Sequence, residues 1–223
     1  MKKSYFISPL ILQKLIWVPT RLILGFFARF EVRGLDNLKN IKGNVILACN
    51  HSGELDPILP PAALPFWSHL SPMFYASREK SFYEGAGWRR HFYGGNFFKA
   101  WGAYQVIIGL HDYEKALANQ LQIIRDGGTL CIFPEGKTTP NGKMQSIKGG
   151  VAYLSYTTGV PIVPVRLEGT FRFSLNNFLR RRIKLKVIFG EPIHAPNLDK
   201  ENISVSVFKE HANMVMSVVD NMI

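Results

Sequence analysis

Short apolar runs recur along this chain, and segments that read as helices lie between them. The runs NVILACN (44–50) and TLCIF (129–133) are typical of strands that are buried on both faces of a sheet. Strands that alternate with helices predict βαβ units, and hence an α/β fold. We expect a single domain with a largely parallel mixed sheet flanked by helices, whose strands are 44–50, 73–77, 103–108, 129–133, 162–168 and 183–189.

Residues that begin or end helices delimit the expected helices. Asp112 is suited to cap the start of one helix, and Gly127 and Gly159 are suited to end two of them. We expect helices at about 113–125, 148–158 and 205–222. A chain of 223 residues is long enough for one such domain with a core that needs no disulfide or metal.

The first 29 residues differ from the rest of the chain. They contain five basic residues and no acidic residue among many apolar ones. Lys14, Pro19 and Arg21 divide them into charge-free pieces of roughly ten, six and seven residues, below the ~18–20 that a membrane-spanning helix needs. We therefore expect residues 1–29 to form an interfacial helix or short hairpin that lies on an anionic membrane, and residues 30–223 to form the domain. A cleaved signal peptide and a core helix are the alternatives.

Charge indicates an acidic partner. The net charge is +11, and a second acid-free cluster holds Arg172, the run 180–182, Lys184 and Lys186. Basic residues mixed with Trp, Phe and Leu suit a lipid surface better than a nucleic acid, so no nucleic-acid partner is expected. The arginine run 180–182 is open to three interpretations: a solvated loop, a dock for an acidic carrier protein, or a lipid contact.

Cysteine and histidine usage predicts no metal and no cofactor. The only two cysteines, Cys49 and Cys131, lie within expected strands and are interpreted as reduced core thiols. His51, Glu54 and Asp56 lack a further histidine or cysteine at a ligand spacing, so a metal site is not expected there.

The stretch TLCIFPEGKTTPNGK (129–143) allows two interpretations. Its Gly136-Lys137-Thr138 trio looks like the end of a phosphate-binding P-loop. The first glycine of such a loop would lie five residues before Gly136, but that position is Cys131. Pro134 also has no amide hydrogen to offer a phosphate. The P-loop interpretation therefore fails, and Glu135 remains as a carboxylate delivered by the end of a strand.

A second expected strand also ends in polar residues. His51 follows the strand 44–50, and Asp56 comes five residues later, just before Pro57. Asp56 is suited to cap a short, irregular helix, which would let its carboxylate reach the imidazole of His51. A carboxylate on one imidazole nitrogen fixes the tautomer and leaves the other nitrogen as a base.

The two motifs together resemble the glycerolipid acyltransferase family, the lysophosphatidic acid acyltransferases and their relatives. Asn50-His51 through Asp56-Pro57 is similar to the first block of that family, and Phe133-Pro134-Glu135-Gly136 to the third. Gly102-Ala103-Tyr104 lies where the second block belongs, the run 160–165 is similar to the fourth, and Lys148-Gly149 resembles a pair common after the third. The likeness runs from about residue 30 to 193.

The resemblance implies a transferase of membrane phospholipid biosynthesis. It would move a fatty acyl group from acyl-CoA or acyl carrier protein to the hydroxyl of a lysolipid, as a peripheral protein on the cytoplasmic face of the cell membrane. His51 would be the general base and Asp56 would orient it, while Glu135 would either hydrogen-bond the acceptor or brace its loop. A thioester or ester hydrolase with the same His-Asp pair is the alternative reaction.

The sequence departs from the family where the family binds phosphate. Lys137-Thr138-Thr139 replaces the usual Thr-Arg-Ser, and Ile107-Ile108 lies where the second block ends in arginine. Lysine supplies the charge without the bidentate fork of arginine, so 1-acylglycerol-3-phosphate, other lysolipids and other lipid-linked hydroxyls all stay open as acceptors. The predicted substrate-binding residues are Arg78, Glu135, Gly136, Lys137, Thr138 and Lys148.

Overall fold

The computed structural model describes residues 4–77, 95–107, 109–110, 112–195 and 204–222. Its strands are β1 (Glu31–Arg33), β2 (Ile46–Cys49), β3 (Met73–Ser77), β4 (Ala103–Gln105), β5 (Thr129–Ile132), β6 (Ile162–Glu168) and β7 (Lys186–Phe189). Its α-helices are α1 (Ile7–Phe27), α2 (Leu59–Ala63), α3 (Gly95–Ala100), α4 (Tyr113–Ala116), α5 (Ala118–Arg125), α6 (Gly150–Thr158), α7 (Leu175–Leu179) and α8 (Val205–Asn221).

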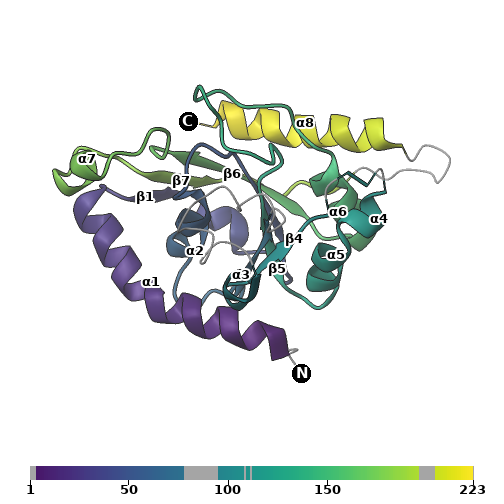
Figure 1. Ribbon diagram of the computed structural model, residues 1–223, viewed down its shortest axis with the longest axis horizontal. Coiled ribbons are helices and arrows are strands. Elements are labelled where there is room, and N and C mark those ends of the chain that lie inside the picture. The colour runs from purple at the N-terminus through teal and green to yellow at the C-terminus, as the bar shows by residue number, and fades with distance from the viewer. Residues whose placement is uncertain (1–3, 78–94, 108, 111, 196–203, 223) are drawn as a thin grey trace.

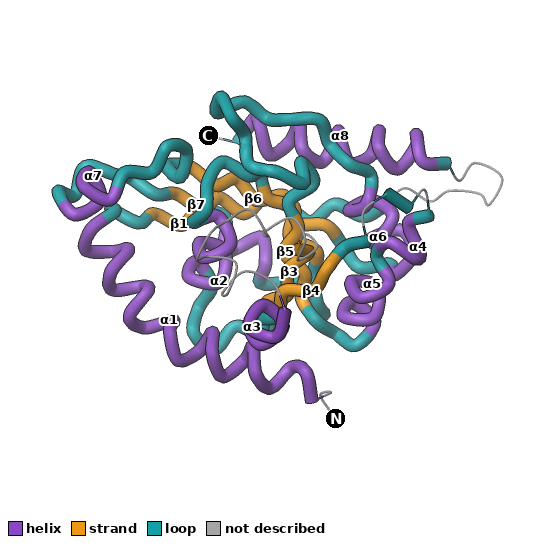
Figure 2. Tube along the Cα trace, viewed as in Figure 1, coloured by secondary structure: helices purple, strands orange, loops and turns teal. Residues whose placement is uncertain are grey.

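These strands form one seven-stranded sheet in the order β1-β7-β6-β2-β5-β3-β4. Neighbouring strands run parallel except for β6 and β7, which pair antiparallel. Figure 2 shows the strands in the middle of the molecule with helices on both sides. The prediction of a largely parallel mixed sheet flanked by helices is therefore confirmed.

Residues of the central strands alternate between two hydrophobic cores. Ile46 and Ala48 of β2 face the core shared with α5, α6 and α8, whereas Leu47 and Cys49 face the core shared with α1 and α2. Strands of a parallel sheet are covered on both faces, which is why β2 and β5 read as continuous apolar runs. Cys49 and Cys131 are reduced and fully buried with their Sγ atoms 3.6 Å apart, and this burial raises the pKa of the Cys49 thiol well above its usual value.

Most expected helix boundaries are confirmed. The carboxylate of Asp112 accepts hydrogen bonds from the amides of Glu114 and Lys115, and Gly159 ends α6 with a φ of 71°. The expected helix 113–125 is divided into α4 and α5 at Leu117, whose φ of −112° lies outside the helical range. The strands are shorter than expected at 103–108 and 183–189, and β1, α3 and α7 were not predicted.

The N-terminal segment forms one helix, the first of the two forms expected for it, and not a hairpin. A short 3₁₀ turn, Ser4–Phe6, leads into α1, which continues through Pro19 to Phe27. Helical residues Ser4–Phe27 are long and apolar enough to cross a membrane by length and composition alone. Lys14, Pro19 and Arg21 therefore interrupt the apolar run but not the helix itself.

The polar side chains of α1 point toward the domain. The side-chain amide of Gln13 donates to the carbonyl of Met73 and its oxygen accepts from the Met73 amide, at 2.7 and 2.9 Å. One turn later the indole of Trp17 donates to Leu64, and after another turn Arg21 donates to Ala62, at 3.0 and 2.9 Å. The helix is therefore fixed lengthwise along the domain, as Figure 1 shows.

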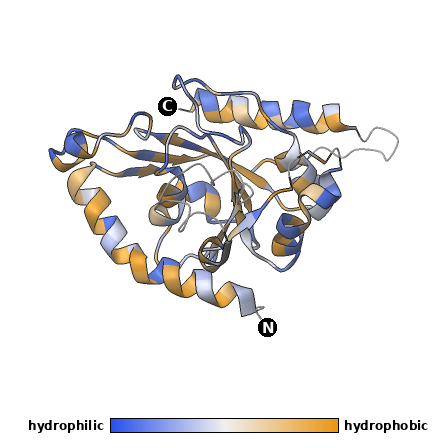
Figure 3. Ribbon diagram, in the orientation of Figure 1, coloured by the Kyte–Doolittle hydropathy of each residue, from blue (hydrophilic) through white to orange (hydrophobic). Residues whose placement is uncertain are grey.

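The opposite face of α1 is apolar and uncovered. Leu15 is 71% exposed and Leu22 is 67% exposed, and Figure 3 shows a largely hydrophobic ribbon along this helix. Trp67 is 87% exposed beside α1, where the Lys14 ammonium lies over its ring. This arrangement is the reverse of an ordinary surface helix, which turns its apolar face inward.

Candidate active site

The two sequence motifs meet because β2 and β5 are neighbours. These strands are parallel, with Ala48 opposite Ile132, so the segments that follow them both leave the sheet at its carboxyl edge. His51 leaves β2 there, and Phe133 leaves β5. The His51 ring stacks on the Phe133 ring with centroids 4.3 Å apart and an interplanar angle of 26°. Such an edge is where ligands of open α/β sheets bind.

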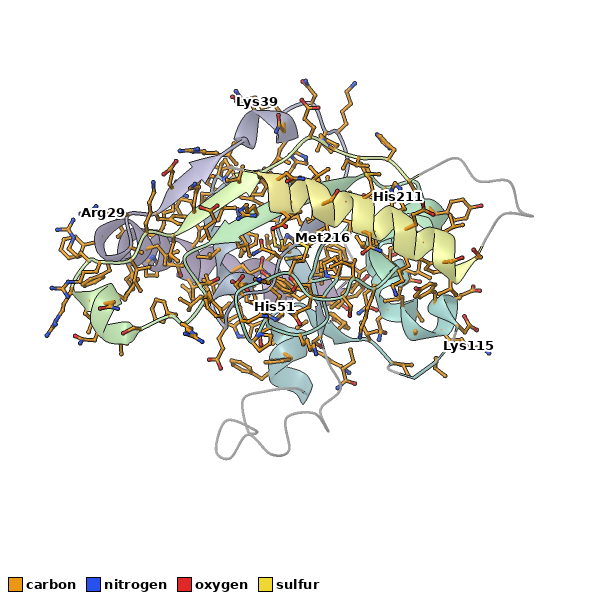
Figure 4. The ribbon with its side chains drawn as sticks, turned by 90° about the horizontal axis from the view of Figure 1, so that it is seen from above. Arg29, Lys39, His51, Lys115, His211 and Met216 are labelled. Carbon is orange, nitrogen blue, oxygen red and sulfur yellow. The ribbon has the colours of Figure 1, made fainter. Side chains whose placement is uncertain are left out.

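His51 and Asp56 form a hydrogen-bonded pair. The Nδ1 atom of His51 lies 2.8 Å from Oδ2 of Asp56, whose side chain is fully buried, while 19% of the His51 side chain remains exposed. In the neutral imidazole a hydrogen on Nδ1 bonds to this carboxylate, which leaves Nε2 without a hydrogen and able to act as a base. Figure 4 shows His51 near the centre of the molecule.

Asp56 orients the loop as well as the ring. Its Oδ2 also accepts hydrogen bonds from the backbone amides of Ser52 and Gly53, at 2.6 and 2.8 Å. The carboxylate therefore points back along the chain, and the expectation that Asp56 caps the following helix is wrong. The helix that follows is nevertheless short and irregular, as expected: a 3₁₀ turn, Asp56–Ile58, leads into the five residues of α2.

Two residues of this loop lie close to β6 and the turn that follows it. The side-chain amide of Asn50 exchanges two hydrogen bonds with the backbone of Leu167, at 2.7 and 3.0 Å. A Cβ atom on Gly53 would lie 2.4 Å from the carbonyl oxygen of Thr170, so only glycine fits there. Neither role was predicted from the sequence. The position of Gly53 between His51 and Asp56 was the only feature that indicated a close backbone approach there.

Glu135 braces the histidine loop. Its Oε1 accepts from the backbone amide of His51, and its Oε2 accepts from the amide of Gln145, both at 2.8 Å. The side chain is 3% exposed. The His51 carbonyl also accepts from the amide of Thr139 at 2.9 Å, so the loop after β5 holds both polar backbone groups of His51. Of the two roles expected for Glu135, these bonds support bracing.

Five of the predicted substrate-binding residues, Glu135, Gly136, Lys137, Thr138 and Lys148, lie in the segment between β5 and α6. Gly136 has a φ of 68°, and the Nζ atom of Lys148 would lie 3.1 Å from a Cβ built on it, so the structure brings these two residues together. Lys137 and Thr138 are exposed beside them. Arg78 lies outside the described residues. The side chain of Ile107 is exposed, and Ile108, its partner in the altered second block, is also outside the described residues.

A cavity of about 190 Å³ is lined by Asn50, Ser52, Glu135, Lys143 and Arg166, among others. Arg166 is the arginine nearest in the sequence to the fourth block, but its guanidinium already donates to Glu168 and to Asp220, at 2.9 and 3.4 Å. Two carboxylates of the protein therefore already hold its guanidinium. The described residues contain no cluster of three His, Cys, Asp or Glu side chains that could hold a metal ion.

Known proteins resemble this chain in sequence. Residues 29–168 match the family model called Acyltransferase. The chain is 27% identical over 190 residues to a probable 1-acyl-sn-glycerol-3-phosphate acyltransferase of Mycoplasma pneumoniae, covering 78% of this chain and 67% of that protein. It is 25% identical over 185 residues to a 1-acyl-sn-glycerol-3-phosphate acyltransferase of Pseudomonas aeruginosa, covering 81% of this chain but 64% of that protein. The chain thus spans about two thirds of the length of these relatives.

A solved structure shares the fold. The crystal structure of the 1-acyl-sn-glycerophosphate acyltransferase PlsC of Thermotoga maritima superposes with a TM-score of 0.60 and 20% identity, covering 96% of this chain and 79% of that one. The family match covers more than half of the chain and includes both motifs at the sheet edge. The resemblance inferred from those motifs is confirmed, and the chain belongs to the acyltransferase family.

Proposed function

We propose that this protein transfers a fatty acyl group from a thioester, acyl-CoA or acyl carrier protein, to the hydroxyl of 1-acylglycerol-3-phosphate. The observation that carries the proposal is the His51–Asp56 pair, 2.8 Å apart at the carboxyl edge of the sheet. The names of the sequence relatives support this acceptor. The family of the chain supports acyl transfer over hydrolysis.

In the proposed mechanism the acceptor supplies the nucleophile. An alcohol attacks a thioester poorly at neutral pH, so Nε2 of His51 takes the hydroxyl proton as the oxygen bonds to the thioester carbonyl carbon. The buried carboxylate of Asp56 stabilises the resulting imidazolium through Nδ1. When the C–S bond breaks, the proton passes from Nε2 to the thiolate, which leaves as a free thiol. No serine or other side chain needs to be acylated.

Product analysis tests this reaction directly. Purified protein incubated with a thioester donor and lysophosphatidic acid should yield phosphatidic acid and free thiol in equal amounts, measured by mass spectrometry and a thiol reagent. Free fatty acid released at the same rate with or without the acceptor would identify a hydrolase instead. Acylation of another lysolipid in preference to lysophosphatidic acid would identify a different acceptor.

We further propose that Lys148 and Lys137 hold the acceptor phosphate, because both lie at the loop that carries Gly136. Losing one charged hydrogen bond weakens binding by about 1.5–3 kcal/mol, so Lys148→Gln should raise KM for lysophosphatidic acid by roughly tenfold or more. KM for monoacylglycerol, which has no phosphate, should not change. The matched control is Lys115→Gln on α4, and equal KM values in both variants would remove Lys148 from the phosphate site.

We propose that the protein is a peripheral protein of the cytoplasmic membrane face and that residues 1–29 attach it through the uncovered face of α1. Replacing Leu15 and Leu22 with serine should weaken binding to phospholipid vesicles more than a hundredfold, because each buried leucine contributes about 1.5–3 kcal/mol. Vesicle co-sedimentation measures this effect. Serine at Val205 and Met214, two exposed positions of α8, is the matched control, and equal binding by both variants would place the membrane contact elsewhere.

A further inference from the structure

We infer that α7 and the arginines around it form a second lipid-contact surface, which extends the uncovered face of α1 and selects anionic headgroups. This surface, called the α7 corner below, consists of Phe26, Arg172, Leu175, Leu179 and the run 180–182. The inference rests on the proposed attachment of α1 to a membrane. It adds that the domain itself, and not the N-terminal helix alone, contacts the bilayer.

Contacts between aromatic rings join α7 to the end of α1. Phe178 is buried on α7, and its ring centroid lies 5.4 Å from that of Phe27. The guanidinium of Arg181 lies 4.6 Å from the ring centroid of Phe26, which is an exposed residue of α1. Figure 1 shows α7 beside the C-terminal end of α1, on the side of the molecule away from α4. The α7 corner is therefore continuous with the proposed membrane face.

Exposed leucines give the corner an apolar element of its own. Leu175 is 63% exposed and Leu179 is 54% exposed. They lie four residues apart on one helix, so they share one face. A solvated loop has no need for two leucines on one exposed face beside a phenylalanine, whereas an interfacial segment buries such side chains at the boundary between headgroups and acyl chains.

Ion pairs divide the basic cluster into two groups. Lys184 pairs with Glu31 at 2.7 Å and Lys186 pairs with Glu168 at 2.9 Å, so these lysines support the sheet. Arg172 and the arginines 180–182 are exposed, and no carboxylate of the described residues forms an ion pair with them. Four uncompensated guanidinium groups beside two exposed leucines match the charge and the apolar layer of an anionic bilayer surface.

Two arginines of the α7 corner, Arg172 and Arg181, have a strained backbone conformation. The described non-glycine residues with positive φ are Arg29, Arg172 and Arg181, at 44°, 49° and 59°. Arg181 follows the end of α7, where the amides of Arg181 and Arg182 donate to Phe178 and Asn177 in the pattern that glycine normally completes. Glycine would adopt this conformation without strain, so the arginine side chain has a use that outweighs the strain.

An anionic lipid surface explains these features better than an acidic carrier protein. Charge alone would suit either partner. The exposed leucines and the contact between Arg181 and Phe26 make the α7 corner part of one apolar face with α1. A carrier protein docked at the corner would occupy part of the face that the membrane is proposed to cover. The lipid proposal therefore commits to headgroups such as phosphatidylglycerol, and carrier docking becomes an outcome of the test.

Vesicle binding by two variants tests the proposal. Dissociation constants are measured on phosphatidylcholine vesicles with and without phosphatidylglycerol, together with the melting temperature. Each arginine near an anionic surface contributes roughly a fivefold gain in affinity, so Arg180→Gln with Arg182→Gln should lower the preference for anionic vesicles by about 25-fold. Arg181→Gly should lower it by about fivefold while its melting temperature stays equal or rises, because glycine relieves the strain.

The controls separate this surface from α1 and from the reaction. Lys115→Gln with Lys209→Gln removes the same charge from α4 and α8 and should leave the preference unchanged. An unchanged preference for anionic vesicles in both arginine variants would overturn the proposal. It would do so even if the Leu15 and Leu22 variant loses binding, because that variant tests α1 alone. Normal vesicle binding combined with slower transfer only from a carrier-protein donor would show a protein dock and overturn it too. Because binding needs no turnover, these results stand apart from the acyl-transfer assay.

Discussion

Replacing His51 with alanine should lower the rate of acyl transfer by about 10²–10⁴-fold, the contribution typical of a positioned general base. The variant should remain folded, because 19% of the side chain is exposed and the amides of Ser52 and Gly53 still bind the Asp56 carboxylate. Initial rates with saturating donor and acceptor measure the effect, and circular dichroism checks the fold. A variant that is folded and fully active would exclude His51 as the base.

Asp56→Asn separates orientation from charge at the same site. Asparagine can be placed in two orientations. In one, its oxygen still accepts from the two loop amides and faces Nδ1 without a negative charge. In the other, its NH₂ group faces Nδ1 and presents a hydrogen to it. In either orientation the imidazole loses the carboxylate that fixes its tautomer, so most of the activity should disappear. Unchanged rates would mean that the buried aspartate only shapes the loop.

Glu135→Gln should lower both stability and turnover. One of the two carboxylate oxygens becomes an amide group that faces a backbone N–H, either that of His51 or that of Gln145. An unpaired buried donor costs about 1–3 kcal/mol, so the free energy of unfolding in urea should fall by at least that amount. The rate at saturating substrate should fall as well, because the His51 loop loses a brace.

The acceptor KM of this variant distinguishes bracing from substrate binding. A brace lowers the stability and the maximal rate but changes KM for the acceptor little. A direct hydrogen bond to the acceptor would do the reverse, with a raised KM and an unchanged free energy of unfolding. Glu191→Gln, at an exposed carboxylate away from the sheet edge, is the matched control for the charge change.

The sequence predicted features that depend on local chemistry. The apolar runs of β2 and β5 located the central strands, because parallel strands buried on both faces need continuous apolar residues. Asp112 and Gly159 marked helix ends through their own capping preferences. The pairing of His51 with Asp56 was predictable because the two residues are five positions apart and a loop easily brings them together.

Features that depend on distant partners were not predictable. Glu135 was recognised as a strand-end carboxylate, but its partner His51 is 84 residues away, and only the pairing of β2 with β5 brings them into contact. The 3-residue strand β1 is too short to carry a pattern and exists because β7 pairs with it. The sequence left a helix and a hairpin open for residues 1–29, because contacts such as the hydrogen bond from Arg21 to Ala62 are tertiary.

The bonds from Gln13, Trp17 and Arg21 have a consequence for kinetics. They fasten α1 to the start of β3 and to α2, so a bilayer beneath that helix would meet the catalytic domain at one fixed height and tilt. The acceptor, itself a lipid, would then reach the imidazole by lateral diffusion. Turnover would follow the mole fraction of acceptor in the surface rather than its concentration in bulk, and diluting it with inert lipid would slow the reaction at constant total acceptor.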